Sequence, residues 1–448
     1  MLQYKYINNM SRNVIRGDTA ASIAASIERA LEAGALEGND RLPSIRGLSA
    51  TLKVSPVTVA AAYRLLRSRG LAAGRGRRGT RVRPTARTTA PAAAARSIRV
   101  GAVDLATGNP DPALLPPLSG ALRTLNTDHH LYGGPIELPA LAAFAASEFE
   151  ADGIPRGPVV VTSGGLDAIE RVLREVTRTG DRVAVEDPTF PALLDLLGSL
   201  GLTPVPFTLD DEGPRSDSFE RALGPGVRVA IVTSRAHNPT GAVISSPRAT
   251  ELARLLKHRP DVVLLEIDDA AAVSGAPLVT LTTGRSQWAV VRSTSKFLGP
   301  DLRVAVMTGD ALTISRVQRR QATSVRWVSH LLQDLALRLW SDPANGRLLA
   351  RAADLYAERR SALIDALAVH GIAACGRSGL NVWIPLREET ATVQALADRG
   401  WAVAAGERFR LQSPPAIRVT TAALSPVDAK RFAADLAATV RPSAAVLA

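Results

Sequence analysis

One lysine in an unusual setting is the first candidate for chemistry. Only five of the 54 basic residues are lysines, so arginine is the ordinary cation of this chain. Lys296 stands in the run Ser-Thr-Ser-Lys-Phe-Leu-Gly-Pro-Asp-Leu-Arg, directly after an apolar stretch that predicts a strand. A lysine whose pKa is lowered by burial and by nearby positive charge can condense with an aldehyde, whereas a guanidinium cannot. The alternative is a solvated loop lysine.

Other polar and aromatic residues also follow predicted strands. Asp268 ends one of them, where a carboxylate could hold a pyridine nitrogen protonated or simply cap a helix. Asn238 stands in the rigid turn His-Asn-Pro-Thr-Gly after another strand. Phe190 could stack on a flat ring or only pack. Arg303, seven residues after Lys296, could make a bidentate contact with a phosphate.

The elements that must position these residues alternate between strands and helices. The pair Gly164 and Gly165 precedes a helical pattern, so backbone amides there could bind a phosphate. Apolar runs predict strands at 158–162, 182–186, 229–233, 262–268, 289–293 and 304–308. This alternation predicts a largely parallel sheet with crossover helices and functional groups at the carboxyl ends of its strands. A helical stretch at 312–340 and short strands near 381–385, 401–404 and 417–420 predict a smaller α+β subdomain after it.

The charge of the chain is concentrated at its start. Residues 1–100 carry 18 Lys and Arg against 5 Asp and Glu, whereas the rest carries 36 basic and 37 acidic residues. A basic segment joined to a nearly neutral body indicates a nucleic-acid contact linked to something else. A solvated basic tail is the alternative, but such a tail would lack apolar periodicity.

The basic segment has the pattern of three short helices. Asp18 can cap the first, Ser44 can cap the second, and Pro56 fits the first turn of the third. Two helices around so short a turn form a helix-turn-helix, whose second helix can enter a major groove. The Gly/Arg-rich run 71–83 predicts a hairpin, or wing, whose arginines meet DNA phosphates. These wing arginines are Arg75, Arg77 and Arg78.

Residues 17–83 closely resemble the winged helix-turn-helix of GntR-type regulators, through Leu-Pro-Ser-Ile-Arg at 42–46 and Val-Ser-x-x-Thr-Val at 54–59. The resemblance implies double-stranded DNA as a partner. Arg46, Thr58 and Arg64 are then candidate DNA contacts, with an ordinary surface role as the alternative for each. The family usually has a polar or basic residue where Pro56 stands, so no contact is carried over to that position.

The body resembles the pyridoxal-phosphate (PLP) aminotransferases of fold type I, in the order and identity of its candidate residues. The resemblance implies that Lys296 bonds covalently to the PLP aldehyde. It also implies that Asp268 faces the ring nitrogen, that Asn238 bonds the ring hydroxyl and that Phe190 stacks on the ring. The implied phosphate-binding residues are Gly165, Leu166, Ser293 and Arg303.

Two further residues follow from the same resemblance. Tyr132 matches a tyrosine that reaches the phosphate bound by a neighbouring subunit, which implies a homodimer. Arg418 matches the arginine that holds the carboxylate of an amino acid, here an effector or a substrate.

A GntR-type head on an aminotransferase-like body is the architecture of the MocR family of transcriptional regulators. The expected division is a DNA-binding domain at 1–83, a linker at 84–100, a large PLP-binding domain at 101–340 and a small subdomain at 341–448. Motifs at 234–241, 295–303 and 327–334 also resemble those of a member concerned with vitamin B6 metabolism, and imply control of that metabolism.

Two positions depart from the family pattern. Ala270 and Ala192 stand where many members have a tyrosine and an arginine, so we expect PLP binding to survive and recognition of a second carboxylate to be weakened. A PLP-responsive regulator, with an amino acid or a B6 vitamer as effector, is the favoured function. A working aminotransferase with an autoregulatory head stays open because of Arg418, and so does a repressor whose body only dimerises.

Composition excludes several other classes. The single cysteine, Cys375, rules out an internal disulfide and a cysteine-based zinc site, and no metal site is expected. No apolar run approaches the length needed to span a membrane, and the first residues lack the pattern of a secretory signal. We therefore expect a cytoplasmic protein.

Overall fold

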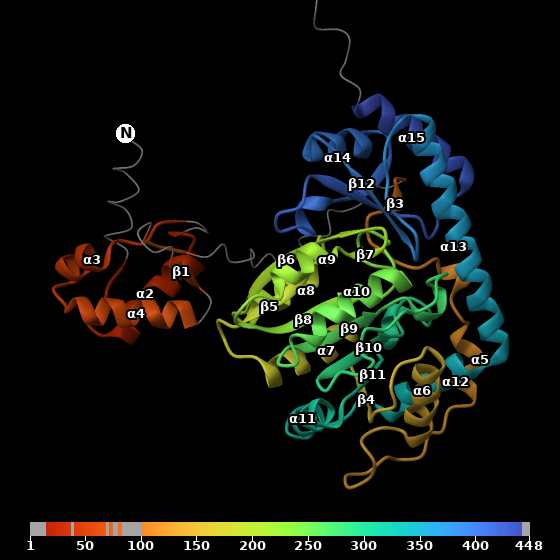
Figure 1. Cartoon of the computed structure of the whole chain (residues 1–448), viewed down its shortest axis with the longest axis horizontal. Helices are drawn as coiled ribbons and strands as arrows, with labels where there is room; N and C mark the ends of the chain where they lie inside the picture. The colour runs from red at the N-terminus through yellow and green to blue at the C-terminus, as the bar shows by residue number, and fades with distance from the viewer. Residues whose placement is uncertain (1–14, 37–39, 69–70, 75–78, 83–100, 441–448) are drawn as a thin grey trace, which may run out of the picture. The chain divides into compact units, whose positions relative to one another are not determined.

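The computed structural model describes residues 15–36, 40–68, 71–74, 79–82 and 101–440. These residues divide into two compact units, one built around the N-terminal helices and one around the two larger sheets (Figure 1). The expected linker and the three wing arginines lie outside the described residues. Within the ranges above, no helix is long and apolar enough to cross a membrane.

The N-terminal unit has the helix-turn-helix that the sequence predicts, followed by a two-stranded antiparallel hairpin. Ser44 accepts the Gly47 N–H at 3.0 Å and so caps the second helix, whereas Thr19 rather than Asp18 caps the first. The phenol of Tyr63 donates to the Pro43 carbonyl at 2.7 Å within the core. The elements are α2 (Ala20–Glu32), α3 (Ile45–Leu52), α4 (Pro56–Ser68), β1 (Ala72–Gly74) and β2 (Thr80–Val82).

The larger sheet of the second unit is mixed, with the order β4-β11-β10-β9-β8-β5-β6-β7. β8, β9 and β10 run parallel, and β11 runs antiparallel to both of its neighbours. The strands are β4 (Val159–Thr162), β5 (Arg182–Asp187), β6 (Thr203–Asp210), β7 (Gly213–Pro214), β8 (Val227–Thr233), β9 (Val263–Asp268), β10 (Trp288–Ser293) and β11 (Ala305–Gly309).

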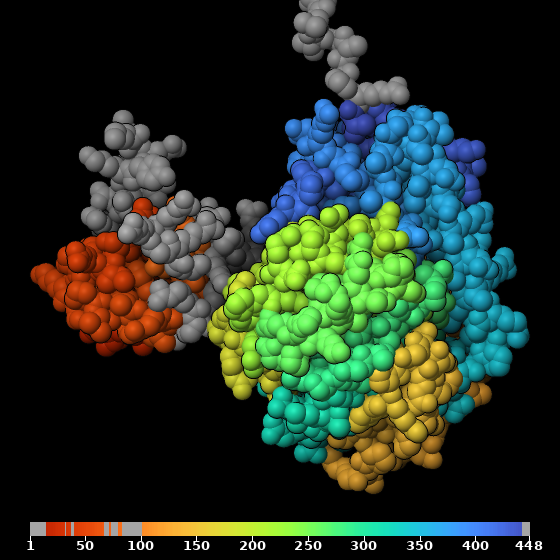
Figure 2. Space-filling view, in the orientation of Figure 1, coloured from red at the N-terminus to blue at the C-terminus, as the bar shows by residue number. Residues whose placement is uncertain are grey.

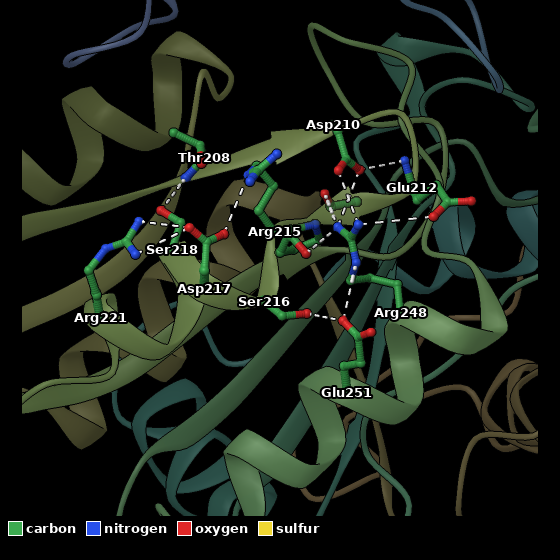
Figure 3. A network of polar contacts seen from close by, with 12 residues as sticks. Thr208, Asp210, Glu212, Arg215, Ser216, Asp217, Ser218, Arg221, Arg248 and Glu251 are labelled. Atoms are coloured by element: carbon green, nitrogen blue, oxygen red, sulfur yellow. Dashed lines mark hydrogen bonds and ion pairs between the residues drawn. The ribbon is translucent and has the colours of Figure 1, made fainter.

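Helices join and cover these strands. They are α5 (Leu118–Arg123), α6 (Pro139–Ala151), α7 (Gly165–Val176), α8 (Pro191–Ser199), α9 (Ser216–Ala222), α10 (Ser246–Lys257), α11 (Ala311–Ala322) and α12 (His330–Ser341). The helical stretch expected at 312–340 is thus two helices with a break at 323–329. An ion pair attaches α10 to the end of β6, where Arg248 binds Asp210 at 3.0 Å, and the Thr208 N–H of β6 donates to the Ser218 hydroxyl of α9 at 3.0 Å (Figure 3).

The smaller sheet has the order β12-β14-β13-β3. Its first strand in the chain, β3 (Val103–Leu105), pairs in parallel with β13, although the sequence-based division put these residues in the large domain. The other elements are α13 (Pro343–Val369), β12 (Asn381–Pro385), α14 (Glu389–Asp398), β13 (Trp401–Ala405), β14 (Ala416–Thr420) and α15 (Pro426–Val440). The long α13 runs from α12 to this sheet (Figure 1), and the smaller subdomain adjoins the larger one (Figure 2), with the backbone N–H groups of 411–413 donating to Asp187.

Candidate functional site

Lys296 lies three residues beyond the end of β10, next to the buried Phe297. Its Nζ atom donates to the carbonyl of Gly108 at 2.7 Å. Burial lowers the pKa of Lys296; the charge of Asp269 opposes this change and the charge of Arg418 adds to it. A lowered pKa leaves more of the lysine as the free amine, the form that attacks an aldehyde.

The two aspartates at the end of β9 have different surroundings. Asp268 is fully buried, and its oxygens accept from Arg235 at 2.8 and 3.0 Å and from Arg292 at 2.8 Å. Burial opposes its ionisation, yet the charges of Arg292 and Arg235 hold the pKa of Asp268 below its usual value. Burial raises the pKa of the neighbouring Asp269 to about 6, and the charge of Lys296 opposes that rise. Asp268, the residue predicted to face the ring nitrogen, thus accepts hydrogen bonds from two arginines in this structure.

Gly164, Gly165 and the guanidinium of Arg303 lie together at the start of α7 and form what we call the phosphate cradle. Gly164 has a positive φ of 99°, and a Cβ there would lie 3.0 Å from Nη2 of Arg303. No side chain caps the helix, so the first amides, including those of Gly165 and Leu166, remain available to an anion. A Cβ at Gly165 would lie 3.5 Å from that of Ser293. The predicted phosphate-binding residues thus lie together, and their donors fit a phosphate.

Arg418 of β14 is 4% exposed and reaches the same strand ends. Its Nη1 donates to Oδ1 of Asn238 at 3.1 Å, and its Nη2 donates to the carbonyl of Ala106. Burial lowers the pKa of Arg418 to about 10, so the guanidinium stays charged at neutral pH. Its Nε has no hydrogen-bond partner among the described residues. A buried guanidinium with a spare donor suits a carboxylate.

A loop of the smaller subdomain lies against the end of β5, beside Phe190. Asp187 accepts the backbone N–H groups of 411–413 at 2.7 to 2.9 Å. The residue before Phe190 donates its N–H to the carbonyl of Phe409 at 2.7 Å. The ring of Phe409 in turn lies 4.9 Å from the guanidinium of Arg418. The site is therefore assembled from both sheets.

Tyr132 is exposed to solvent and makes none of the contacts described above. It is 79% exposed and makes an edge contact with Trp327, with ring centroids 5.5 Å apart. The guanidinium of Arg326 lies 5.1 Å from the Tyr132 ring. No contact between Tyr132 and the cradle of its own chain is present among the described residues.

The N-terminal unit exposes two of the candidate DNA contacts. Arg46 of α3 and Arg64 of α4 are exposed, whereas Thr58 is half-buried. Sequence reasoning missed Val57, which is 70% exposed in the first turn of α4. An apolar side chain there can contact a thymine methyl group if α4 enters the major groove. Its position beside Pro56 in the predicted recognition helix was the available signal.

Sequence reasoning also missed Gly108, whose carbonyl accepts the hydrogen bond from Lys296. The φ of +73° at Gly108 favours glycine, and a Cβ at this position would lie 3.2 Å from both terminal nitrogens of Arg418 and would press on that side chain. The turn-rich run Gly-Asn-Pro-Asp-Pro at 108–112 was a signal for a close approach of backbone.

Comparisons with known proteins agree with this geometry. Residues 19–82 match the bacterial regulatory proteins of the gntR family, and residues 101–436 match aminotransferase class I and II. The chain is 40% identical to the vitamin B6 salvage pathway transcriptional repressor PtsJ of Salmonella typhimurium, over 94% of this chain and 99% of that protein. It is 27% identical to the HTH-type transcriptional regulator YcxD of Bacillus subtilis, over 80% and 82% of the two chains.

Solved structures support the fold of the body. The multiple substrate aminotransferase of Thermococcus profundus superposes with a TM-score of 0.70 at 20% identity, covering 76% of this chain and 91% of that one. LysN, an α-aminoadipate aminotransferase of Thermus thermophilus, gives 0.68 at 21% identity, covering 77% and 93%.

Fold and site together define a DNA-binding regulator with a body of the PLP-dependent transferase class. The chain belongs to the aminotransferase class I and II family over residues 101–436 and, with its GntR-type head, to the MocR family of transcriptional regulators. Its cofactor is pyridoxal 5′-phosphate, which supplies an aldehyde and an electron-withdrawing ring when bound. Lys296, the cradle at the start of α7, and Asn238 are the residues that would hold it.

Proposed function

We propose that this protein represses genes of vitamin B6 salvage and that its body senses PLP. The observation that carries the proposal is the 40% identity to PtsJ over nearly the whole of both chains, which covers head and body together. The body keeps a lysine, a phosphate cradle and a carboxylate-binding arginine. Occupancy of this site would report the supply of the vitamin to the DNA-binding head.

The proposal includes several finer points. The protein works as a homodimer in the cytoplasm, with an amino acid or a B6 vitamer as a second effector held by Arg418. Its division into a head at 1–83, a linker at 84–100 and a two-part body at 101–340 and 341–448 is kept, with β3 reassigned to the smaller part. Exposed apolar side chains support the dimer: Leu131, next to Tyr132 in the chain, is 73% exposed, and Val325, next to the Arg326 that contacts the Tyr132 ring, is 62% exposed.

A working aminotransferase is the second candidate. The pairing of Arg418 with Asn238 favours it, because transamination requires a clamp for the carboxylate of an amino acid. Ala270 and Ala192 weigh against it, because a methyl group can replace neither a phenol nor a guanidinium in positioning a substrate for repeated proton transfer.

A linkage experiment separates the two functions. PLP is titrated into the full chain with and without a DNA duplex selected by the protein from random sequences. If PLP controls DNA binding, the duplex must change PLP affinity by the same factor by which PLP changes DNA affinity, typically about 5- to 150-fold. Equal PLP affinities, together with steady turnover of an amino acid and a keto acid, would favour the enzyme.

Lys296→Ala is the control for covalent attachment. Borohydride should fix the cofactor of the wild-type protein to the peptide that contains Lys296, and this label should vanish in the variant. Weak noncovalent PLP binding should remain, because the cradle is intact. Label on Lys257 or Lys430 would show that the lysine is wrongly assigned.

A further inference from the structure

Asp268 is the last residue of β9 and Asp269 follows it directly, and their contacts place the two carboxylates on different faces of the sheet. Asp268 stands opposite Arg292 of β10 and binds it. The next residue, Ser293, faces α7, because its Cβ lies 3.5 Å from the Cβ position of Gly165. Oδ1 of Asp269 lies 3.3 Å from that same position. Asp269 and Ser293 therefore share the face that carries the phosphate cradle.

Asp268 belongs to a buried cluster of two arginines and two carboxylates, which we call the Asp268 cluster. Asp152, which follows α6, accepts from Arg235 at 3.0 Å and from Arg292. Both arginines also bind Asp268, so two positive charges balance two negative ones. Charges buried this deeply stay ionised only when they are paired. With 0% of Asp268 exposed, none of its surface remains for a cofactor ring.

We propose that Asp269, rather than Asp268, is the carboxylate that meets the ring nitrogen of PLP, and that the Asp268 cluster is the rigid support behind it. Asp269 is the acidic residue whose charge acts on Lys296, and no described residue donates a hydrogen bond to it. An ionised carboxylate at this place holds the ring nitrogen protonated and keeps the ring electron-withdrawing. The inference rests on PLP binding alone, so it can fail or hold independently of any response in DNA binding.

Asp269→Asn is the direct test, in the full chain without DNA. We expect PLP affinity to fall about 10- to 100-fold, as for the loss of a charge-assisted hydrogen bond. The visible absorbance band of the lysine-bound cofactor should also titrate at a higher pH, because an unprotonated ring repels a positive charge on the lysine nitrogen less. Wild-type affinity and an unchanged titration in this variant would overturn the proposal.

Asp268→Asn and Asp152→Asn are the matched controls. Each leaves arginines of the Asp268 cluster short of a partner, so we expect a lower thermal unfolding midpoint and little change in the titration of the absorbance band. Asp152 is the more exposed of the two carboxylates, so Asp152→Asn still tests the cluster if Asp268→Asn does not fold. If either folded control, checked by circular dichroism, shows the shifted band while Asp269→Asn does not, Asp268 is the ring partner.

Discussion

Glu266 of β9 is a buried acid whose charge no cation neutralises. It is 0% exposed and makes no ion pair among the residues that the structure describes. It accepts a hydrogen bond from the Leu281 N–H and one from the Thr280 hydroxyl, the latter at 2.9 Å. Burial raises the pKa of Glu266 to about 7 against the effect of these two bonds. We predict that Glu266→Gln stabilises the protein at pH 8.

The magnitude follows from the shifted pKa. A rise from 4.5 to about 7 corresponds to roughly 3 kcal/mol of folding free energy. Because the folded-state pKa is the higher one, stability falls as pH rises from about 4.5 to 7, and the whole cost is present above pH 7. Glutamine carries no charge, and its amide can donate to Thr280, whose hydroxyl lies 2.7 Å from that of Thr282.

The assay is urea unfolding of the protein without PLP at pH 5 and pH 8. Glu266→Gln should have a higher unfolding midpoint than wild type at pH 8 and nearly the same midpoint at pH 5. Glu186→Gln is the matched control, because this buried glutamate lies 3.2 Å from His237 and bonds Thr233, so losing its charge should bring no gain at pH 8. A Glu266→Gln protein that is less stable at pH 8, with the pH dependence of wild type, would refute the reasoning.

Two further predictions concern DNA and the second subunit. Replacing Arg75, Arg77 and Arg78 together by alanine should weaken binding to every duplex and reduce the slope of log affinity against log salt by up to about 3, since each phosphate contact contributes about 0.9. An unchanged slope in a filter-binding or anisotropy assay would remove the wing from the DNA interface. If Tyr132 completes the site of a second subunit, Tyr132→Ala and Lys296→Ala homodimers should each bind PLP poorly, while mixed dimers regain one native site. Absence of recovered high-affinity, borohydride-fixed cofactor after subunit exchange would place Tyr132 outside the site.

Local signals predict the N-terminal unit closely. Ser44 and Pro56 begin their helices as expected, because side-chain capping and the fixed φ of proline act within one turn. Asp18 was expected to cap the first helix, but Thr19 forms a reciprocal capping box with Ser22. Such an error of one residue is typical of a terminus where neighbouring side chains can both accept.

The strands of the body were predictable where they are buried and apolar, and not elsewhere. β6 was missed because it is only half-buried and contains Pro204 and Pro206, which cannot donate to a ladder. β3 was missed because it has three residues and its partner, β13, lies almost at the other end of the chain. No local pattern encodes such a pairing.

The site shows the same division between local and nonlocal information. Lys296 and the cradle glycines follow from single turns after strands, so sequence reasoning could name them. The choice between Asp268 and Asp269 depends on the register of β9 against β10, and a one-residue difference moves a side chain to the other face. Sequence resemblance named Asp268 alone, and only the folded chain shows that Asp269 is the member that lies beside α7.

The way the site is assembled explains why it suits a sensor. Arg418 belongs to the smaller sheet, while Asn238 and the cradle follow strands of the larger one. Asp187 of the larger sheet holds the 411–413 loop of the smaller subdomain through backbone N–H groups. A ligand that bonds Lys296, the cradle and Arg418 at once therefore contacts both sheets, and its binding free energy depends on how they are placed. By linkage, any arrangement that the ligand prefers gains population when it binds, and this differential affinity is the physical requirement for a signal.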